Sequence, residues 1–173
     1  NTNYIFKNIN YDNIKILNSQ SKPILLPCIV YDTIESKNKT KYLLYKKDDV
    51  RKDKLIVDLI RIIDNILKTK AGLDLKIIKY NVLPIDKKSG FIEIVDNAET
   101  VFNINRSKKF SILNYILEHN SNLTIDQIRE NFTKSCAAYS VISYLLGFGD
   151  RHLDNIMVSE NGTMFHIDFA FIM

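Results

Sequence analysis

Two short segments near the end of the printed sequence decide how this chain folds. Residues 149–157 read GDRHLDNIM, and residues 165–169 read FHIDF. An Asn-Gly pair at 161–162 separates them, and apolar residues flank it on both sides. Asn-Gly between two apolar runs is a strong signal for a β-hairpin. The pattern therefore predicts a polar loop, a short hairpin and a second acidic turn.

Three oxygen-bearing side chains stand in these segments: Asp150, Asn155 and Asp168. Protein kinases use the same Asp-x-x-x-x-Asn spacing in their catalytic loop, and they carry a second Asp in a later D-F-G motif. Phosphoryl transfer needs one carboxylate at the nucleophile, and oxygen ligands for Mg²⁺. The spacing thus predicts Asp150 as the base, with Asn155 and Asp168 as metal ligands. The alternative is a solvated loop, but both motifs occur in order, each beside an apolar strand or helix.

GDRHLDN followed by HIDFA closely resembles the phosphatidylinositol 3-/4-kinase superfamily, whose members carry G-D-R-H-x-x-N and H-I-D-F-G. Residues 135–142, SCAAYSVI, also resemble the helix that leads into that loop. The resemblance implies an α+β, protein-kinase-like fold with two lobes. Residues 1–95 would form an N-lobe antiparallel sheet with one helix, and residues 96–173 would begin a mainly helical C-lobe. The chain lacks an initial Met and stops where a C-lobe normally continues, so we expect a truncated, partial catalytic domain.

Composition is that of a soluble globular domain. The 173 residues are 46% hydrophobic and 25% charged, which suits one domain with a real core. No apolar run is long enough to span a bilayer, and the net charge of +4 permits contact with anionic membranes. No basic stripe alternates with aromatics, so nucleic-acid binding is not expected. Cys28 and Cys136 stand among apolar residues, which predicts buried free thiols in a reducing compartment.

The N-terminal third predicts a hairpin. Residues 14–17 and 24–31 are apolar runs with a turn between them, and Pro27 indicates an edge or a bulge in the second strand. In the family a strand–turn–strand at this place closes over the nucleotide phosphates. The resemblance therefore implies that Ser19 offers its hydroxyl and main-chain N–H to phosphate. A plain hairpin is the alternative.

A strand at 42–46 is followed by an acidic turn and then by a helix. Apolar residues at three-and-four spacing give this helix one apolar face, at Leu55, Ile56, Leu59, Ile62, Ile63, Ile66 and Leu67. The block resembles the family's F-K-x-G-D-D-L-R-Q-D, which implies phosphate binding by Lys46 and a match of Asp53 to the final Asp. This chain has one residue fewer after the Lys, so Lys47 remains the second candidate. The alternative is that both are solvated strand-end lysines.

Residues 76–85 and 91–95 predict two strands around a turn. The sequence GFIEIV at this turn resembles the family hinge, G-F-I-E-x-V. That resemblance implies that the Glu93 carbonyl and the Val95 N–H bind adenine. It also places four residues along the adenine slot: Tyr80, Ile92, Met157 and Ile167. Ordinary core packing is the alternative for each of these four residues.

The middle of the chain predicts a loop and two helices. Residues 98–106 are polar and featureless, which is typical of a loop after a hinge. Ser111 can cap a helix that runs to about His119. Thr124 opens a second helix with capping-box spacing, and Gly147 can end it in a left-handed turn. His166, between apolar strand residues, is expected to be a core histidine.

Four residues near the predicted centre carry further expectations. His152 is a second candidate for the base, or a stabiliser of the transferring phosphate if protonated. Arg151 is expected to hold the loop through a carboxylate or main-chain carbonyls, and Asp154 to be solvated. Ala170 replaces the Gly of D-F-G, which is tolerated only where φ is negative.

The resemblance implies ATP-dependent phosphorylation of the inositol head group of phosphatidylinositol, nearest to the phosphatidylinositol 3-kinases, with ATP and Mg²⁺ as cofactors. It also implies phosphatidylinositol in membranes as a partner, a regulatory subunit or missing N-terminal domains, and a cytoplasmic protein peripheral at membranes. Two alternatives stay open: a catalytically impaired nucleotide-binding or scaffold module, and a protein Ser/Thr kinase of the same superfamily. Ala170 and the altered lysine spacing favour the first alternative.

Overall fold

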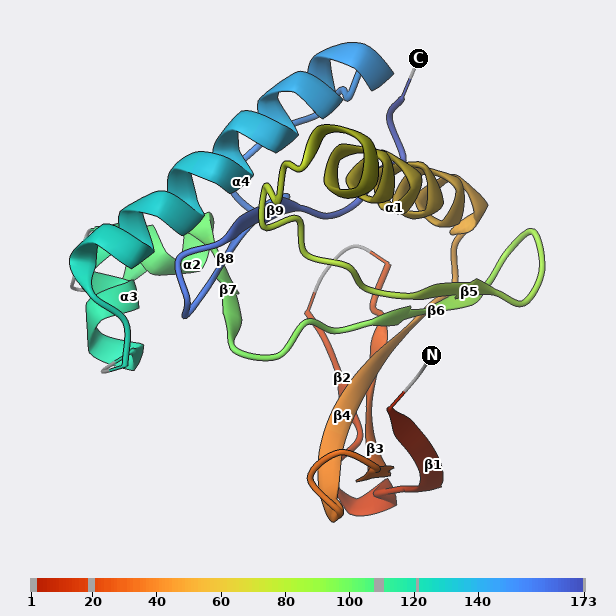
Figure 1. Ribbon diagram of the computed structural model, residues 1–173. Helices are drawn as coiled ribbons and strands as arrows, with labels where there is room; N and C mark the ends of the chain where they lie inside the picture. The colour runs from red at the N-terminus through yellow and green to blue at the C-terminus, as the bar shows by residue number, and fades with distance from the viewer. Residues whose placement is uncertain (1–2, 19–20, 108–110, 121, 173) are drawn as a thin grey trace. The chain divides into compact units, whose positions relative to one another are not determined.

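The computed structural model describes residues 3–18, 21–107, 111–120 and 122–172 (Figure 1). The chain divides into two compact units. The first unit comprises Asn1–Lys54 and Tyr80–Asp96, and the second comprises Leu55–Lys79 and Asn97–Met173. Mixed sheet and helix in one chain agrees with the expected α+β class.

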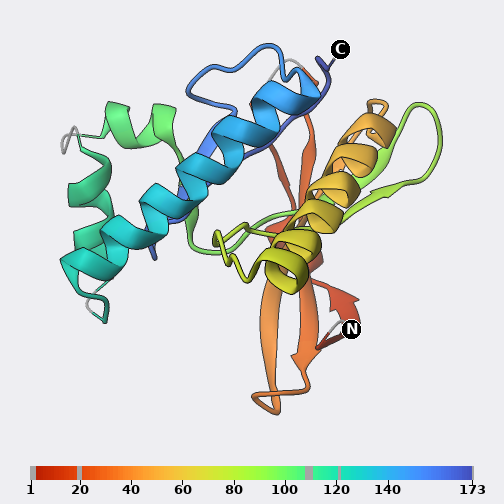
Figure 2. The same ribbon diagram turned by 45° about the horizontal axis from the view of Figure 1, so that its top comes forward.

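The first unit is a six-stranded antiparallel sheet in the order β1-β3-β4-β6-β5, with β2 beside β3. Figure 2 shows β3 and β4 as a long, twisted pair of strands. The elements are β1 (Tyr4–Ile9), a 3₁₀ turn (Tyr11–Asn13), β2 (Lys15–Ile16), β3 (Ile24–Asp32), β4 (Lys37–Lys46), β5 (Val82–Pro84) and β6 (Gly90–Glu93).

Pro27 lies inside β3, where its missing N–H could have cost a ladder hydrogen bond. The neighbour on one side changes at this point: β1 ends opposite Cys28 and β2 begins opposite Leu25. The Pro27 carbonyl accepts from the Asn10 N–H at 2.9 Å, so this edge of Pro27 faces the break between β1 and β2. A residue's N–H and C=O point to the same side of an antiparallel strand. Pro27 therefore lies at a local edge, as expected, although β3 as a whole is an inner strand of the sheet.

The β3–β4 turn is held by a buried carboxylate. Asp32 accepts hydrogen bonds from the N–H groups of Ile34 and Glu35, at 2.9 and 3.2 Å. It also pairs with Lys39 at 2.8 Å. These hydrogen bonds, with the Lys39 side chain first, lower the pKa of the Asp32 carboxyl. The Asp32 carboxylate thus fixes the tip of the hairpin, because it binds two turn N–H groups that would otherwise bond water.

Helix α1 (Arg51–Ala71) follows β4 as expected, but its buried face differs from the predicted one. The fully buried positions between 55 and 67 are Ile56, Val57, Ile60 and Asp64. Leu55, Ile62 and Ile66 lie on the exposed side. The three-and-four spacing identified the helix, but Leu and Ile occur on both faces, so it did not identify the buried stripe.

The second unit holds a three-stranded antiparallel sheet in the order β7-β8-β9, and helices α2, α3 and α4. Its elements are β7 (Ala98–Thr100), α2 (Val101–Arg106), α3 (Ile112–His119), α4 (Ile125–Leu146), β8 (Ile156–Ser159) and β9 (Met164–His166). A buried apolar cluster joins the helices to β8, formed by Val101, Ile104, Ile116, Ile128 and Val158. This core packs against the β8–β9 hairpin, which connects the GDRHLDN and HIDF motifs.

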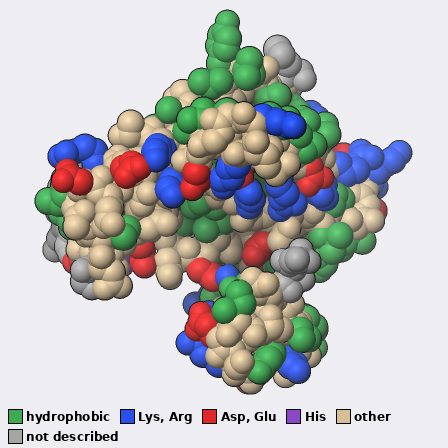
Figure 3. Space-filling view, viewed as in Figure 1, with side chains coloured by type: hydrophobic (Ala, Val, Ile, Leu, Met, Phe, Trp, Pro, Cys, Tyr) green, Lys and Arg blue, Asp and Glu red, His purple; other side chains and the backbone are tan. Residues whose placement is uncertain are grey.

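Helix α4 begins and ends as the sequence predicts. Thr124 and Gln127 form a capping box, in which each side chain bonds the other residue's N–H. Gly147 ends the helix in the left-handed conformation, with φ of 58°. Exposed apolar residues gather near this end, where Figure 3 shows hydrophobic side chains at the surface; they include Val141, Tyr144 and Leu145.

Three local expectations were wrong or only partly right. Residues 98–106 are not a loop: they form β7 and α2, because Val101 and Ile104 bury their side chains one helical turn apart and Thr100 caps the helix. Of residues 76–85 only Val82–Pro84 is a strand, and Lys76 takes a positive φ of 57°, which interrupts an extended run. Ser111 precedes α3 but makes no side-chain capping bond.

Both cysteines are free thiols. Cys28 is buried as predicted, whereas Cys136 is only half-buried on α4. Burial raises the pKa of both thiols. Among the described residues, the helices include none that is both long and apolar enough to cross a bilayer.

Gly90 is the position in the first unit that least tolerates a side chain. A Cβ there would lie 2.2 Å from Val50 Cγ2 and 2.9 Å from the Leu83 carbonyl oxygen. We expect Gly90→Ala to lower the free energy of unfolding by about 2–3 kcal/mol through overpacking. Gly72→Ala meets no atom within 4 Å and should cost only about 1 kcal/mol for its φ of 65°. Urea unfolding measures both; equal losses would contradict the predicted clash.

Candidate active site

The loop that carries GDRHLDN, in the second unit, runs from the end of α4 to β8, and the second motif, HIDF, ends β9 and continues directly after it. The β8–β9 hairpin places the two motifs side by side, with Met157 opposite Phe165. Val158 and Phe165 are fully buried, so the hairpin is anchored in the core. Gly162 turns the hairpin with φ of 88°, where a side chain would meet the Ile128 carbonyl at 3.0 Å.

Arg151 ties the two motifs together through main-chain carbonyls. Its Nε donates to the Gly149 oxygen at 2.8 Å and Nη1 to the Ile167 oxygen at 2.9 Å. Its Nη2 donates to the Asp168 oxygen. The expectation that Arg151 holds the loop is confirmed, and the partners are carbonyls only an arginine fork can reach together.

Aromatic rings cover this guanidinium. Phe148 and Phe169 contact each other with ring centroids 4.8 Å apart, and Arg151 lies 5.9 and 5.7 Å from their centroids. Phe169 is fully buried. The rings shield the guanidinium partly from water, which strengthens its hydrogen bonds to the carbonyls. They also attract its positive charge through cation–π interactions. One further hydrogen bond closes the loop: the Gly149 N–H donates to the Phe171 oxygen at 2.8 Å.

Asn155 is buried, with 8% of its surface exposed, and is held on three sides. Its Nδ2 donates to the Asp150 oxygen at 2.8 Å, and its N–H donates to the His152 oxygen at 3.0 Å. Its own carbonyl accepts from the Ile167 N–H at 3.1 Å. Because Nδ2 is committed to Asp150, the remaining side-chain atom, Oδ1, is an acceptor suited to a hard cation.

Asp150 and Asp168 share an unusual backbone conformation. Their φ values are 49° and 59°, in the left-handed region that few residues other than Gly, Asn and Asp adopt. Such residues cost about 1–3 kcal/mol each and persist where the surroundings hold them. Here Arg151 and Asn155 provide that hold, by bonding the carbonyls of Asp168 and Asp150 respectively.

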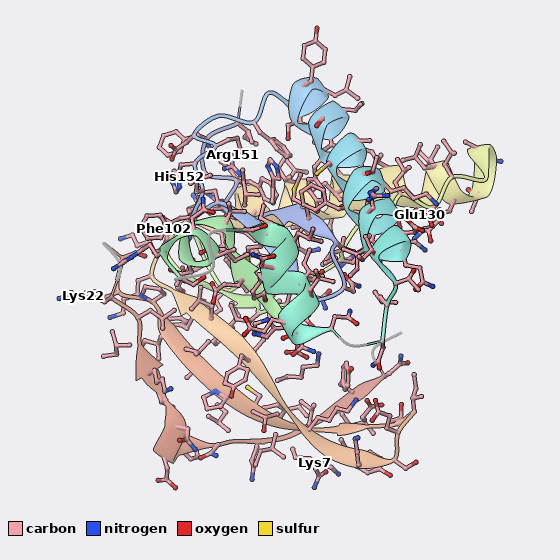
Figure 4. All side chains as sticks on the ribbon, turned by 90° about the vertical axis from the view of Figure 1, so that its left-hand side faces the viewer. Lys7, Lys22, Phe102, Glu130, Arg151 and His152 are labelled. Atoms are coloured by element: carbon pink, nitrogen blue, oxygen red, sulfur yellow. The ribbon has the colours of Figure 1, made fainter. Side chains whose placement is uncertain are left out.

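His152 is exposed beside Arg151 in the same loop (Figure 4). Its Nδ1 accepts a hydrogen bond from the Asp154 N–H at 3.2 Å. A ring nitrogen that accepts carries no proton, so the neutral imidazole has its hydrogen on Nε2. In this state His152 presents a donor, not a base, to its surroundings.

His166 is the core histidine that the sequence predicts. It is buried and stacks on Tyr139, with ring centroids 5.1 Å apart and planes 6° apart. Its Nδ1 has no hydrogen-bond partner among the described residues. Burial, assisted by the positive charge of Arg151, lowers the pKa of His166 to about 4. Burial also raises the pKa of Tyr139, with a smaller contribution from the Asp64 charge.

The predicted residues of the first unit lie along β4, α1 and β6. Lys46 is the last residue of β4, half-buried and opposite Gly90, whereas Lys47 follows the strand and is exposed. Asp53 is buried in the first turn of α1. Tyr80 is also buried, and Ile92, Glu93 and Val95 are half-buried in or just after β6. Ser19 lies outside the described residues.

In the second unit, Met157 and Ile167 are half-buried, one in β8 and one just after β9. Among the described residues, no group of three or more His, Cys, Asp and Glu side chains converges as a metal site. The candidate magnesium ligands therefore remain one carboxylate, Asp168, and one amide, Asn155, as the sequence predicts.

Sequence reasoning missed Phe148 and the hydrogen-bonding role of Asn81. Asn81 donates its N–H and its Nδ2 to the Glu93 carboxylate Oε2, at 3.0 and 2.6 Å. Asn81 and Glu93 lie on either side of the β5–β6 turn, so only the register of the two strands could have shown that their side chains meet. Phe148 directly precedes the GDRHLDN motif. An aromatic residue three positions before Arg151 could have predicted a cation–π contact between the two side chains.

Comparison with known proteins agrees with this geometry. The chain belongs to the phosphatidylinositol 3- and 4-kinase family, since the model described as "Phosphatidylinositol 3- and 4-kinase" matches residues 39–173. It is also similar to phosphatidylinositol 3-kinase VPS34 of Saccharomyces cerevisiae, with 40% identity over 142 residues. That alignment covers 79% of this chain but only 16% of the yeast protein. The resemblance inferred from the motifs is confirmed.

The Arg151 fork generates a stability prediction. Arg151→Lys keeps the charge but replaces three spread donor nitrogens with a single ammonium nitrogen, so we expect the free energy of unfolding to fall by about 2 kcal/mol. Arg129→Lys is the matched control, because Arg129 is exposed and donates from one nitrogen to Asp126, 3.1 Å away. Urea unfolding of both variants decides; an equal midpoint for both would show that the fork adds no stability.

The buried His166 generates a pH prediction. Between pH 6.5 and about 4 the unfolded chain binds a proton that folded His166 does not, so stability rises with pH in this window. As pH falls from 6.5 to 4, this residue should remove up to about 3 kcal/mol of unfolding free energy. His166→Phe keeps a stacking ring and should flatten that slope in urea unfolding. His119→Phe, at an exposed site, should keep it; a slope unchanged in His166→Phe would contradict the assignment.

Proposed function

We propose that this chain is the catalytic part of a phosphoinositide 3-kinase-like enzyme, which transfers the γ-phosphoryl group of ATP to a hydroxyl of the phosphatidylinositol head group. One observation carries the proposal: Arg151 and Asn155 tie together the two motifs that hold Asp150, Asn155 and Asp168. Membership of the phosphatidylinositol 3- and 4-kinase family and similarity to a phosphatidylinositol 3-kinase support the lipid substrate.

The domain division is also proposed. We infer a protein-kinase-like, two-lobed arrangement, with residues 1–95 as the N-lobe up to the hinge and residues 96–173 as the start of the C-lobe. The antiparallel sheet of the first unit and helices α2, α3 and α4 support it. Residues 55–79, which include most of α1, group with the second unit instead. The aligned part of the chain spans about 16% of the length of the yeast relative.

Asp150 would accept the proton of the inositol hydroxyl as the new O–P bond forms and the bond from γ-phosphorus to the bridging oxygen of ADP breaks. His152 would donate its Nε2 hydrogen to an oxygen of the transferring group, since its Nδ1 accepts from the Asp154 N–H. In this tautomer the hydrogen of the His152 ring is on Nε2, so His152 would act as a donor, and Asp150 would be the base.

Mg²⁺ would be held by Asn155 Oδ1 and the Asp168 carboxylate, and it would neutralise charge on the phosphate oxygens. The donor set fits: Asn155 is buried with its Nδ2 committed to Asp150, so its oxygen is the atom left for a cation. The left-handed φ of Asp168 and the bond from Arg151 to its carbonyl fix the start of its side chain.

The ATP-binding residues that the resemblance implies are part of the same proposal. Lys46 and Ser19 would contact the phosphates, and Asp53 would be a further ATP-binding residue. The Glu93 carbonyl and Val95 N–H would bind adenine. Tyr80, Ile92, Met157 and Ile167 would line its slot. The half-buried position of Lys46 inside β4 favours it over the exposed Lys47.

Two alternatives were weighed against this function. Ala170 in place of the D-F-G glycine favoured an impaired module, but Ala170 does not adopt a positive φ, so Ala fits its backbone. A protein Ser/Thr kinase is the second alternative. Phosphatidylinositol in membranes is the proposed partner, with a regulatory subunit or N-terminal domains, and the protein would be cytoplasmic and peripheral at membranes.

The test is transfer of labelled phosphate from magnesium-ATP to phosphatidylinositol vesicles by the whole protein. We expect Asp150→Asn to lower turnover by about a hundred- to ten-thousandfold, the usual contribution of a general base. Asp168→Asn should abolish the magnesium dependence of nucleotide binding. Asp154→Asn is the matched control, because Asp154 is exposed in the same loop.

Three other outcomes would contradict the proposal. ATP binding without transfer to lipid or protein, with Asp150→Asn unchanged, identifies a scaffold module. Transfer to Ser or Thr of a peptide but not to lipid identifies a protein kinase. A loss in Asp154→Asn equal to that in Asp150→Asn would remove the special role of Asp150.

A further inference from the structure

A small polar cavity lies against strands β2, β3 and β4 of the first unit, with β3 paired to both of the others (Figure 1). Its volume is about 160 Å³. Two residues of β3, one of them a proline, form its apolar side. The rest of the lining consists of five polar side chains, from Asn10, Asn13, Lys15, Thr40 and Tyr42. Each of these five can donate a hydrogen bond.

The strand register explains why three of these side chains converge. Lys15 of β2 lies opposite Leu25 of β3. Tyr42 of β4 lies opposite Pro27 of β3. Residues directly opposite each other share a face of the sheet, and so do residues two apart along one strand. Lys15, Thr40 and Tyr42 therefore project from the same face, above the apolar side formed by β3.

The break between β1 and β2 brings in the two asparagines. The 3₁₀ turn Tyr11–Asn13 connects these two strands beside Pro27. The Asn10 N–H donates to the Pro27 oxygen at 2.9 Å, and the Asn13 N–H donates to the Asn10 oxygen at 3.3 Å. These main-chain hydrogen bonds hold the turn against β3, and both asparagine side chains line the cavity.

The polar groups of this cavity are not used for internal contacts. Among the described residues, none of the five polar side chains forms a hydrogen bond or an ion pair with another part of the chain. Lys39 of the same unit, by contrast, pairs with the buried Asp32 carboxylate at 2.8 Å. Within the described lining, Lys15 is therefore a positive charge surrounded by four neutral donors and by no carboxylate.

This donor set suits a phosphate group. A phosphate monoester carries close to two negative charges near neutral pH and offers several strong acceptor oxygens. Lysine binds phosphate as a point charge, while neutral hydroxyl and amide donors can fix the remaining oxygens. A carboxylate has only two oxygens and would leave most of these donors unused. The cavity is smaller than the roughly 300–1,000 Å³ of pockets for drug-sized ligands, so it suits one such group.

We propose that this cavity binds a phosphate group, with the Lys15 ammonium neutralising its charge and the other four polar side chains donating to its oxygens. None of the lining residues is among those proposed above for ATP, Mg²⁺ or proton transfer. The proposal therefore goes beyond the proposed function and does not depend on it. Inorganic phosphate and the phosphorylated head group of a lipid present the same chemistry, and the experiment separates these two sources.

The first measurement is the dissociation constant for inorganic phosphate, by equilibrium dialysis with labelled phosphate. Lys15→Ala should weaken binding by about ten- to a hundredfold, the range for a hydrogen bond between charged partners. Thr40→Val keeps the shape of the side chain and should weaken binding by about three- to tenfold, since it removes one neutral donor. Lys87→Ala is the matched control, because Lys87 is an exposed lysine in the β5–β6 turn of the same unit.

The second measurement is co-sedimentation with phosphatidylcholine vesicles that contain either phosphatidylinositol or phosphatidylinositol monophosphate. Binding that needs both the monophosphate and Lys15 identifies a lipid head group as the source. Phosphate binding that depends on Lys15, without a difference between the two vesicles, identifies free phosphate. Either result supports the proposed site.

Three results would overturn it. The native protein fails to bind phosphate, or binds acetate equally well. Lys15→Ala loses no more affinity than Lys87→Ala. Phosphate binding is lost in Lys46→Ala and retained in Lys15→Ala, which would place the anion at the proposed ATP phosphate residue instead. Cooperative urea unfolding of each variant confirms that it is folded, so a loss of binding is a loss at the site. ATP binding that survives in Lys15→Ala leaves the proposed function standing whichever way this test falls.

Discussion

The hydrogen bonds of the Arg151 guanidinium are the interaction on which the arrangement of the GDRHLDN and HIDF motifs depends. One side chain bonds the carbonyls of Gly149, Ile167 and Asp168, and so joins segments separated by a hairpin. Left-handed backbone at Asp150 and Asp168 is unfavourable by itself, and main-chain carbonyls that face one another repel. A planar cation between them removes both problems, because it satisfies the carbonyls and fixes the backbone that carries them. The aromatic rings of Phe148 and Phe169 then keep water from competing.

The hairpin below this cation supplies rigidity. Val158 and Phe165 bury their side chains completely, and β8 is joined to the helices through the apolar cluster of the second unit. Asn155 stands at the start of the hairpin, and both its main-chain N–H and its amide Nδ2 donate to main-chain oxygens of the loop. Its single uncommitted oxygen is therefore presented by a side chain that has little freedom to turn away. A metal ligand on a rigid element is positioned more accurately than one on a free loop.

The sequence predicted what depends on local chemistry. The capping box at Thr124 and the left-handed Gly147 are each encoded within a few residues, and each was found where expected. Residues 98–106 were misjudged because two apolar side chains in a polar stretch give little periodicity, although the core around them makes them a helix. The Asn81–Glu93 pair was invisible for a different reason: it depends on which residues the ladder places opposite each other, and register is a long-range property.

The hydrogen bond from the Gly149 N–H to the Phe171 oxygen makes the catalytic segment a closed loop of chain, joined at its neck. The entropic cost of closing a loop rises only with the logarithm of its length. Changes of length inside the loop therefore alter the closure entropy little, whereas the neck has no such freedom. A Cβ at Gly149 would lie 3.3 Å from the Phe171 oxygen, closer than most side-chain carbons approach an atom. The segment can thus vary in length far more readily than in the one residue that closes it.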